Sequence, residues 1–430
     1  MLDAPSLTEV APGRATIDRV RERGGWSSVI SPETPTPGID TRIGAAEAAS
    51  RLGVKKETIY AYVSRGLLHS ERHIDGKTST FDPAEVDRLR RHRNDRRPGR
   101  LEVAVASAIT EVTDGRVAYR GHPIEEIVAA AVPYESVAEL LWTGTLADVD
   151  PWTPGDTVVD AVRRASLALP AHATPTDRMM AGVVAAGAAD PFRDDRSPEG
   201  VTTTGRSLIR AIVDSLTPLT DVDADRLARR LWVRLTDRSP TDWPLLERAL
   251  IVLADHGMAT STLAARLAAS TRAGPHAVML AALGAVAGPL HGAASRTVHQ
   301  LFVDAEEHGA DAAIAEVMRR DGRVPGVGHF IHKTADPRHD LLFDALATSR
   351  LDERRLDVIA GVASRIADRI PVAPNIDLAL GALTYAADMH ADAGEVIFAI
   401  ARSAGWLAHS LEEYDEAPIR FRPVGRYVAR

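Results

Sequence analysis

The chain contains no cysteine among its 430 residues. Without thiols it can form no disulfide, no thiolate zinc site and no cysteine nucleophile. Long apolar runs are also missing: Ala277–Ala287 is among the longest, and it falls well short of the roughly 20 residues that cross a bilayer. The N-terminus lacks a basic segment followed by an apolar core, so no secretory signal is visible. We therefore expect a cytoplasmic protein without membrane contact.

The overall composition is that of a globular protein, but the charge is unevenly distributed. Hydrophobic residues make up 45% of the chain, charged residues 26%, and the net charge is −8. A chain of 430 residues predicts two or three domains, or one large two-part domain with a small one. From Arg42 to Arg100 we count 14 Lys or Arg against 8 Asp or Glu. This segment is basic while the remainder is acidic, as expected if the segment meets phosphates.

The first hundred residues divide into a leader and a small module. Residues 1–40 are rich in Pro, Ser, Thr and Gly, which predicts a disordered leader. Residues 41–97 show helical apolar spacing, broken at Gly53 and resumed after it, and Asp75-Gly76 is a hairpin signal. The pattern predicts helix, turn, helix, two short strands and a third helix, over Ile43–Leu52, Lys55–Ser64, Leu67–Phe81 and Pro83–Arg93.

Residues 41–97 resemble the MerR-like winged helix-turn-helix family through IGAAEAASRLGVKKETIYAYVSRGLL and TFDPAEVDRL. The resemblance implies that residues 73–77 form the wing and that DNA is a partner. A solvated helical module for protein contacts or dimer assembly is the alternative interpretation. The residues that the resemblance places on or near the recognition helix are Lys55, Lys56, Thr58, Tyr60 and Tyr62.

The remaining residues, 98–430, are predicted to be nearly all helical. Ala, Leu and Val recur at three- and four-residue spacing, punctuated by Pro and Gly. Short strands are expected only at Ala108–Val112 and Arg116–Tyr119. An all-α body follows. Among its predicted helices are Thr204–Leu216, Trp243–His256, Asp340–Ser349 and Leu378–Met389.

Two histidines and one aspartate in this body lie beside Gly, Pro or Asn. They are His291 in GPLHGAA, His329 in PGVGH and Asp377 in PNID. Such neighbours present a side chain at a turn or helix start. This set suits proton removal next to a carbonyl while a second carbonyl is polarised. Asp377 also fits a helix cap, which is compatible with a role as base.

From about Leu101 to Arg430 the chain resembles the citrate synthase family. The matching stretches are VAYRGHPIEEI, LADHGMATST, LGAVAGPLHGAA, PGVGHFIHKTADPR, PNIDLALG, VIFAIARSAGWLAHSLEE and RFRPVGRYV, in the family's order. The resemblance implies large and small helical domains, with the mobile small one at roughly 260–370, paired as a homodimer. It implies no cofactor beyond the acyl-CoA substrate. Asp255-His256 could begin a metal site, but no third ligand is apparent, so no metal is expected.

The resemblance also assigns roles to individual residues. His291 would hydrogen-bond the thioester oxygen of acetyl-CoA, His329 would polarise the ketone of oxaloacetate, and Asp377 would remove the methyl proton. Arginine forks suit the planar carboxylates of a dianion. The implied oxaloacetate ligands are His256, Arg338, Arg402 and, from the neighbouring subunit, Arg422, and the implied CoA-binding turn comprises Val324, Gly326, Val327 and Gly328.

Some positions depart from the family pattern. The usual HGGA is HGAA at His291, and Gly257 follows His256 where an acidic residue is common. Phe330 and His332 stand where many members carry Arg and Tyr. These changes affect the CoA side and the packing around His256. The other histidines, His299, His332, His339 and His409, are expected to be structural or solvated.

The resulting hypothesis is an acyltransferase of the tricarboxylic acid cycle that condenses acetyl-CoA with oxaloacetate. One alternative is a 2-methylcitrate synthase that uses propionyl-CoA with the same residues. The other is a DNA-binding regulator whose citrate synthase-like body senses a metabolite. Retention of His291, His329 and Asp377 argues against a pure sensor.

Overall fold

The computed structural model describes residues 42–64, 67–72, 78–94, 104–222, 224–288, 291–292 and 294–422. The chain forms two compact units, Met1–Ala104 and Val105–Arg430. The predicted leader, 1–40, and the predicted wing, 73–77, lie outside the described residues.

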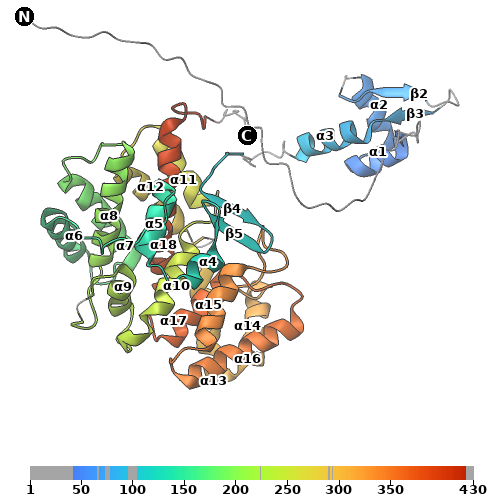
Figure 1. Ribbon diagram of the computed structural model, residues 1–430. Coiled ribbons are helices and arrows are strands. Elements are labelled where there is room, and N and C mark those ends of the chain that lie inside the picture. The colour runs from blue at the N-terminus through green and yellow to red at the C-terminus, as the bar shows by residue number, and fades with distance from the viewer. Residues whose placement is uncertain are drawn as a thin grey trace, which may run out of the picture. The chain divides into compact units, whose positions relative to one another are not determined.

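The N-terminal unit is the expected helix-turn-helix with short strands (Figure 1). Gly53 ends the first helix in the left-handed conformation, at φ 61°, where its N–H donates to carbonyls of that helix. The first helix starts at Ala45 and not at Ile43, because Ile43 and Gly44 pair with the last strand. The sheet order is β1-β3-β2. The elements are β1 (Ile43–Gly44), α1 (Ala45–Leu52), α2 (Lys56–Ser64), β2 (Ser70–Arg72), β3 (Ser79–Phe81) and α3 (Pro83–Asn94).

The C-terminal unit is helical apart from one small antiparallel sheet of β4 (Thr110–Thr113), β5 (Arg116–Tyr119) and β6 (His122–Pro123). The predicted all-α class is confirmed. The helices are α4 (Ile124–Ala129), α5 (Tyr134–Thr143), α6 (Asp156–Ala168), α7 (Pro175–Ala189), α8 (Pro198–Asp214), α9 (Leu227–Leu235), the 3₁₀ turn η1 (Pro240–Asp242), α10 (Trp243–Leu253), α11 (Thr260–Ser270), α12 (Pro275–Val286), α13 (Ala294–His308), α14 (Ala310–Asp321), α15 (Pro337–Ala347), α16 (Glu353–Arg369), α17 (Ile376–Ala386) and α18 (Ala393–Asp415).

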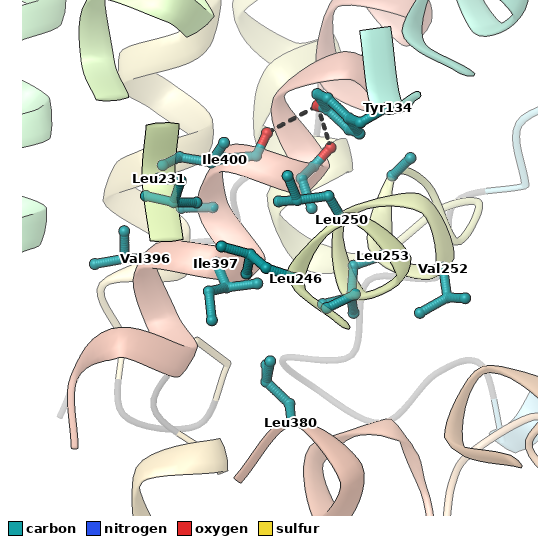
Figure 2. Packing of buried hydrophobic residues seen from close by; sticks show 14 of the residues in the cluster. Tyr134, Leu231, Leu246, Leu250, Val252, Leu253, Leu380, Val396, Ile397 and Ile400 are labelled. Atoms are coloured by element: carbon teal, nitrogen blue, oxygen red, sulfur yellow. Dashed lines mark hydrogen bonds between the residues drawn. The ribbon is translucent and has the colours of Figure 1, made fainter. Parts of the chain in front are cut away.

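Helix α18 is the centre of this unit. It packs against α5, α8, α10, α11 and α12, and most of its residues are buried. Figure 2 shows Ile397 and Ile400 of α18 beside Leu246 and Leu250 of α10. The hydroxyl of Tyr134 donates to the carbonyls of Ile400 (2.9 Å) and Ala401 (2.8 Å), which ties α5 to the same helix. The residue after these carbonyls, Arg402, is thereby held in place.

Several helix boundaries differ from the sequence-based expectation, and two of the earlier starts follow a capping side chain. Helix α8 starts at Pro198 and not at Thr204, because Ser197 accepts from an N–H of its first turn. Helix α15 starts at Pro337 and not at Asp340, because Asp336 caps it. Helix α17 ends at Ala386, short of the expected Met389.

The end of α10 matters most for the site. The helix stops at Leu253, three residues before the expected end. Gly257 has φ +61°, and its N–H donates to the Asp255 carboxylate at 2.8 Å, which turns the chain away from the helix. Asp255 and His256 therefore lie on a loop directly after α10.

The predicted small subdomain at 260–370 stays a prediction. Within that range α13, α14 and α16 pack on one another, while α11 and α12 pack on α18. In the described residues, no helix combines the length and apolarity that a membrane span needs.

Candidate active site

The loop after α10 holds a buried carboxylate beside His256. Asp255 is fully buried, and its Oδ2 lies 3.4 Å from Nε2 of His409 on α18. Gly405 packs so closely on Asp255 that a Cβ there would collide with it. Although burial opposes ionisation, His409 and Arg402 outweigh it and lower the pKa of Asp255 to about 2. Asp255 is therefore a fixed negative charge under the site.

Three histidines gather on this loop and on the segment before α15. The ring centroids of His256 and His329 are 5.1 Å apart, and those of His329 and His332 are 5.0 Å apart. Nε2 of His256 lies 3.0 Å from Nε2 of His332. His256 and His332 are buried, and His329 is half-buried.

The backbone fixes the proton position on His329. Its Nδ1 accepts from the N–H groups of Ile331 (3.1 Å) and His332 (3.2 Å), so the neutral ring carries its proton on Nε2. Burial, followed by the positive charge of Arg338, lowers the pKa of His329 to about 4. At neutral pH His329 is therefore an uncharged Nε2–H donor.

Two buried guanidinium groups flank the histidines in different ways. Arg338 donates from Nε (2.9 Å) and Nη2 (2.7 Å) to the two oxygens of Asp336. Nε of Arg402 donates to the Leu253 carbonyl at 2.8 Å, and its guanidinium lies over the Phe398 ring, 4.8 Å from the centroid. Among the described residues, the terminal nitrogens of Arg402 have no hydrogen-bond partner. A buried cation of this kind is suited to an anionic ligand.

Asp377 lies in the first turn of α17, and Asn375 caps that helix. The Asn375 side-chain oxygen accepts from the Asp377 N–H at 2.9 Å, so the Asp377 carboxylate is left for other contacts. It lines a cavity of about 410 Å³ together with Ala294 and residues 324–328. Burial raises the pKa of Asp377 to about 6, with Arg338 opposing the shift and Asp336 adding to it. A carboxylate with this pKa is a suitable proton acceptor near neutral pH.

The predicted CoA turn is bound to the segment before α17 by its backbone. The Asn375 N–H donates to the Gly326 carbonyl at 2.9 Å, and the Gly328 N–H donates to the Ala373 carbonyl at 2.8 Å. Gly326 has φ +76°, and a Cβ there would lie 2.9 Å from the Cα of Leu378. Val324, Gly326, Val327 and Gly328 all line the same cavity as Asp377.

His291 lies between α12 and α13, and the Phe398 ring contacts both His291 and Arg402. Its Nε2 is 2.9 Å from the Ser261 hydroxyl, and its ring meets Phe398 edge-on at 5.4 Å. Burial and the charge of Arg402 lower the pKa of His291 to about 4. Like His329, it is a neutral imidazole at pH 7.

The structure brings most of the predicted residues together, with two qualifications. Arg402 acts on the pKa of both His256 and His291, and Arg338 acts on that of Asp377, so the groups form one electrostatic neighbourhood. No hydrogen bond or ring contact joins Asp377 to His291 within the described residues. Arg422 is exposed. Within the residues that the structure describes, it has no hydrogen bond to any of the other predicted residues.

Sequence reasoning missed three contributors to the site. His332 was expected to be structural or solvated, yet it is buried against His256. Asp336 was noted in the Asp-Pro-Arg stretch but given no role, although its place before Pro337 is a capping signal. Phe398 contacts both Arg402 and His291 and has no local sequence signal. Among the described residues, no group of three or more His, Cys, Asp or Glu is arranged to hold a metal ion.

The predicted DNA-contact residues divide by exposure. Lys55, Lys56 and Tyr60 are exposed at the start and outer side of α2, whereas Thr58 and Tyr62 are half-buried. Ile59, between them, belongs to the core of the N-terminal unit. The exposed set is a basic and aromatic surface at a helix N-terminus, which is suited to phosphate contact.

Comparison with known families defines the class of both units. Residues 100–424 match the model of the citrate synthase C-terminal domain, and residues 45–109 match that of the MerR helix-turn-helix regulatory proteins. The chain therefore belongs to the citrate synthase family, and its body is an enzyme of the citrate synthase type. It carries a MerR-like helix-turn-helix segment ahead of that body.

Individual relatives are distant but cover most of the chain. A citrate synthase of Haloferax volcanii is 26% identical over 345 residues, which are 73% of this chain and 90% of the relative. A 2-methylcitrate synthase of Mycobacterium tuberculosis is 27% identical over 394 residues, 84% of this chain and 96% of the relative.

Solved structures show the same fold. Citrate synthase from Pyrobaculum aerophilum superposes with a TM-score of 0.63 at 23% identity, covering 76% of this chain and 91% of that one. The ternary complex of the Thermoplasma acidophilum citrate synthase with carboxymethyl coenzyme A and oxaloacetate superposes with a TM-score of 0.61 at 22% identity. The match covers 76% of this chain and 94% of that one.

Proposed function

We propose that this enzyme condenses acetyl-CoA with oxaloacetate and water to give citrate and free CoA. The observation that supports the proposal best is Asp377, a carboxylate with a pKa raised to about 6 that lines a cavity shared with the glycine turn at 324–328. A thioester methyl is a weak acid, so its base must be joined by a donor that stabilises the enolate. His291, neutral and half-buried, is the proposed donor to the thioester oxygen.

The second half of the reaction needs an activated ketone. In our proposal the Nε2–H of His329 polarises the ketone of oxaloacetate, and the enol carbon attacks it to form the new C–C bond. Water then cleaves the thioester and releases CoA. Asp377 accepts the methyl proton in the first step, and the neutral histidines donate without prior protonation because their pKa values lie near 4.

The two carboxylates of oxaloacetate are proposed to bind Arg338 and Arg402, with His256 as a further ligand. Arg422 is proposed to act in the neighbouring subunit of a homodimer, in keeping with its exposure in this chain. We also propose that the enzyme works in the cytoplasm and needs no metal or cofactor.

The choice of acyl group is tested by free-thiol release with acetyl-CoA and propionyl-CoA. We expect the larger kcat/KM with acetyl-CoA. The relatives include both citrate and 2-methylcitrate synthases, and one methylene in an apolar pocket discriminates by only about 1–3 kcal/mol. A preference for propionyl-CoA would make the enzyme a 2-methylcitrate synthase, and no thiol release with either would refute both.

For the N-terminal unit we propose DNA contact through Lys55, just before α2, and through Lys56 and Tyr60 on that helix. Thr58 and Tyr62 are proposed to support this contact. The charge pattern favours this, because the segment is basic on an otherwise acidic chain. The test measures binding of the whole protein to random-sequence duplex DNA at low salt. We expect the wild type to bind and the double variant Lys55→Glu/Lys56→Glu not to bind. Ligand-dependent DNA binding without any thiol release would favour the regulator instead.

A further inference from the structure

His332 is the residue of the site that the proposed chemistry does not use. Only 1% of it is exposed. Its Nε2 lies 3.0 Å from Nε2 of His256 and 3.9 Å from Oδ1 of Asp336. Its own backbone N–H donates to Nδ1 of His329. Its ring stacks on that of His329, with centroids 5.0 Å apart.

The contact between His256 and His332 constrains both rings. Two imidazole nitrogens 3.0 Å apart form a hydrogen bond only when one of them carries a proton and the other does not. Nε2 of His256 is therefore committed to His332. Its Nδ1 is the remaining nitrogen, and it has no partner among the described residues. Rotation of the His256 ring would break the shared bond in a buried place, which is costly.

We infer that His332 is a positioning residue for the keto-acid substrate: by sharing one proton with His256 it fixes that ring and leaves Nδ1 of His256 directed to the substrate. The substrate's identity rests on the proposed function, but the bond itself does not. His332 is not the catalytic donor to the ketone, since His329 already has a fixed Nε2–H.

His332 could also contribute to the site only by filling space. The test must therefore separate the effect of its hydrogen bond from the effect of its volume. His332→Gln places an amide near the position of Nε2 and can keep a hydrogen bond to His256. His332→Met has a similar size and no such group. The two variants fill the same space and differ in the bond. His299→Met is the control, because His299 is buried with one bond to Thr384 and lies outside the site.

Oxaloacetate binding is measured by calorimetry, and steady-state KM values for both substrates by thiol release. In His332→Met we expect oxaloacetate Kd and KM to rise about 10- to 100-fold, the effect of an unpaired buried polar partner. The KM for acetyl-CoA should stay within about twofold. His332→Gln should stay within about fivefold of the wild type for oxaloacetate. His299→Met should change thermal stability and leave oxaloacetate binding unchanged.

A double-mutant cycle shows whether His332 acts through His256. In a His256→Asn background, His332→Met should add little, because the shared bond is already gone. Full additivity would overturn the inference, as would equal losses in the Gln and Met variants, a matching rise in KM for acetyl-CoA, or no oxaloacetate binding by the wild type. If oxaloacetate binding follows the expected pattern but neither thioester releases thiol, the positioning role stands and the proposed condensation fails.

Discussion

The two sides of the site are held by different means. The side that we propose for the keto acid comprises His256, His329, His332, Arg338 and Arg402. Its side chains are joined to neighbours by hydrogen bonds, with the Arg402 guanidinium anchored at Nε. The side that we propose for the acyl group comprises His291, Asp377 and residues 324–328. There the turn is held by backbone bonds and one bond from the Asn375 side chain, and His291 bonds to Ser261. The Asp377 carboxylate has no hydrogen-bond partner among the described residues.

This difference fits the different demands that the two proposed substrates make on the protein. A small dianion needs charges and donors fixed before it arrives, because reorganising buried polar groups is costly. A long thioester needs a backbone surface and one base. The predictions below test this contrast, from the largest effect to the smallest.

Loss of the base should separate the two sides most clearly. Asp377→Ala should lower kcat by about 1,000-fold, since general base catalysis contributes about 10²–10⁴. Oxaloacetate binding, measured by calorimetry, should be nearly unchanged. Glu353→Ala is the matched control, because Glu353 is an exposed first-turn acid on α16. Loss of oxaloacetate binding together with turnover would show that the two sides are not independent.

Substitution of the two arginines of the keto-acid side should affect oxaloacetate binding equally but protein stability differently. Arg338→Met and Arg402→Met should each weaken oxaloacetate binding by about 100-fold, the value of a charged hydrogen bond. Arg338→Met should also lower the free energy of unfolding by about 3–5 kcal/mol, because it strands buried Asp336.

Arg402→Met breaks no direct ion pair, but it leaves the buried Leu253 carbonyl without its donor, so chemical denaturation should show a smaller loss of about 1–3 kcal/mol. Equal destabilisation of both variants would contradict the view that only Arg338 is part of a buried ion pair.

The acid limb of the activity profile should come from the acyl side. Asp377 must be ionised to accept a proton, and its pKa is about 6. Turnover should therefore fall about tenfold per pH unit below about pH 6. His291 and His329, with pKa values near 4, remain neutral over that range.

The same pKa predicts that the folded state becomes less stable as pH rises, while turnover increases. A carboxylate whose pKa is raised by folding destabilises the ionised folded state, and this cost grows as pH rises from about 4 to about 6. Asp377→Asn should therefore be more stable than the wild type at pH 8, by at most about 3 kcal/mol, and equal to it near pH 4. The residual turnover of Asp377→Asn should no longer fall below about pH 6. If the pH profile of this turnover keeps its acid limb, another group is responsible for that limb.

The backbone of the acyl side gives the smallest effect. Gly326→Ala should cost about 1–2 kcal/mol of stability, because φ is +76° and the new Cβ would press on Leu378. The KM for acetyl-CoA should rise, and that for oxaloacetate should not. Gly361→Ala, on an open face of α16, should be neutral or stabilising. A rise in oxaloacetate KM for Gly326→Ala would contradict the separation of the sides.

The sequence predicted the helical class and most helices, because apolar periodicity is a local signal. It also singled out polar residues flanked by Gly or Pro, such as His329 and Asp377, whose roles stay predictions. Local caps that were overlooked account for the boundary errors at α8 and α15. The partnership of His256 with His332 had no such signal, since 76 positions separate them and only folding brings them together. The same holds for Phe398, which looks like any core residue of an apolar helix.

Asp336 has a practical consequence for mutagenesis of this enzyme. Its two oxygens accept from the N–H, Nε and Nη2 of Arg338 and from the N–H of Ile376 at the start of α17. A substitution there would uncap α15, strand a buried cation and release the helix that carries Asp377, all at once. An inactive Asp336 variant would thus be uninformative about mechanism, and screens that rank positions by lost activity alone would mistake this structural clamp for a participant in the chemistry.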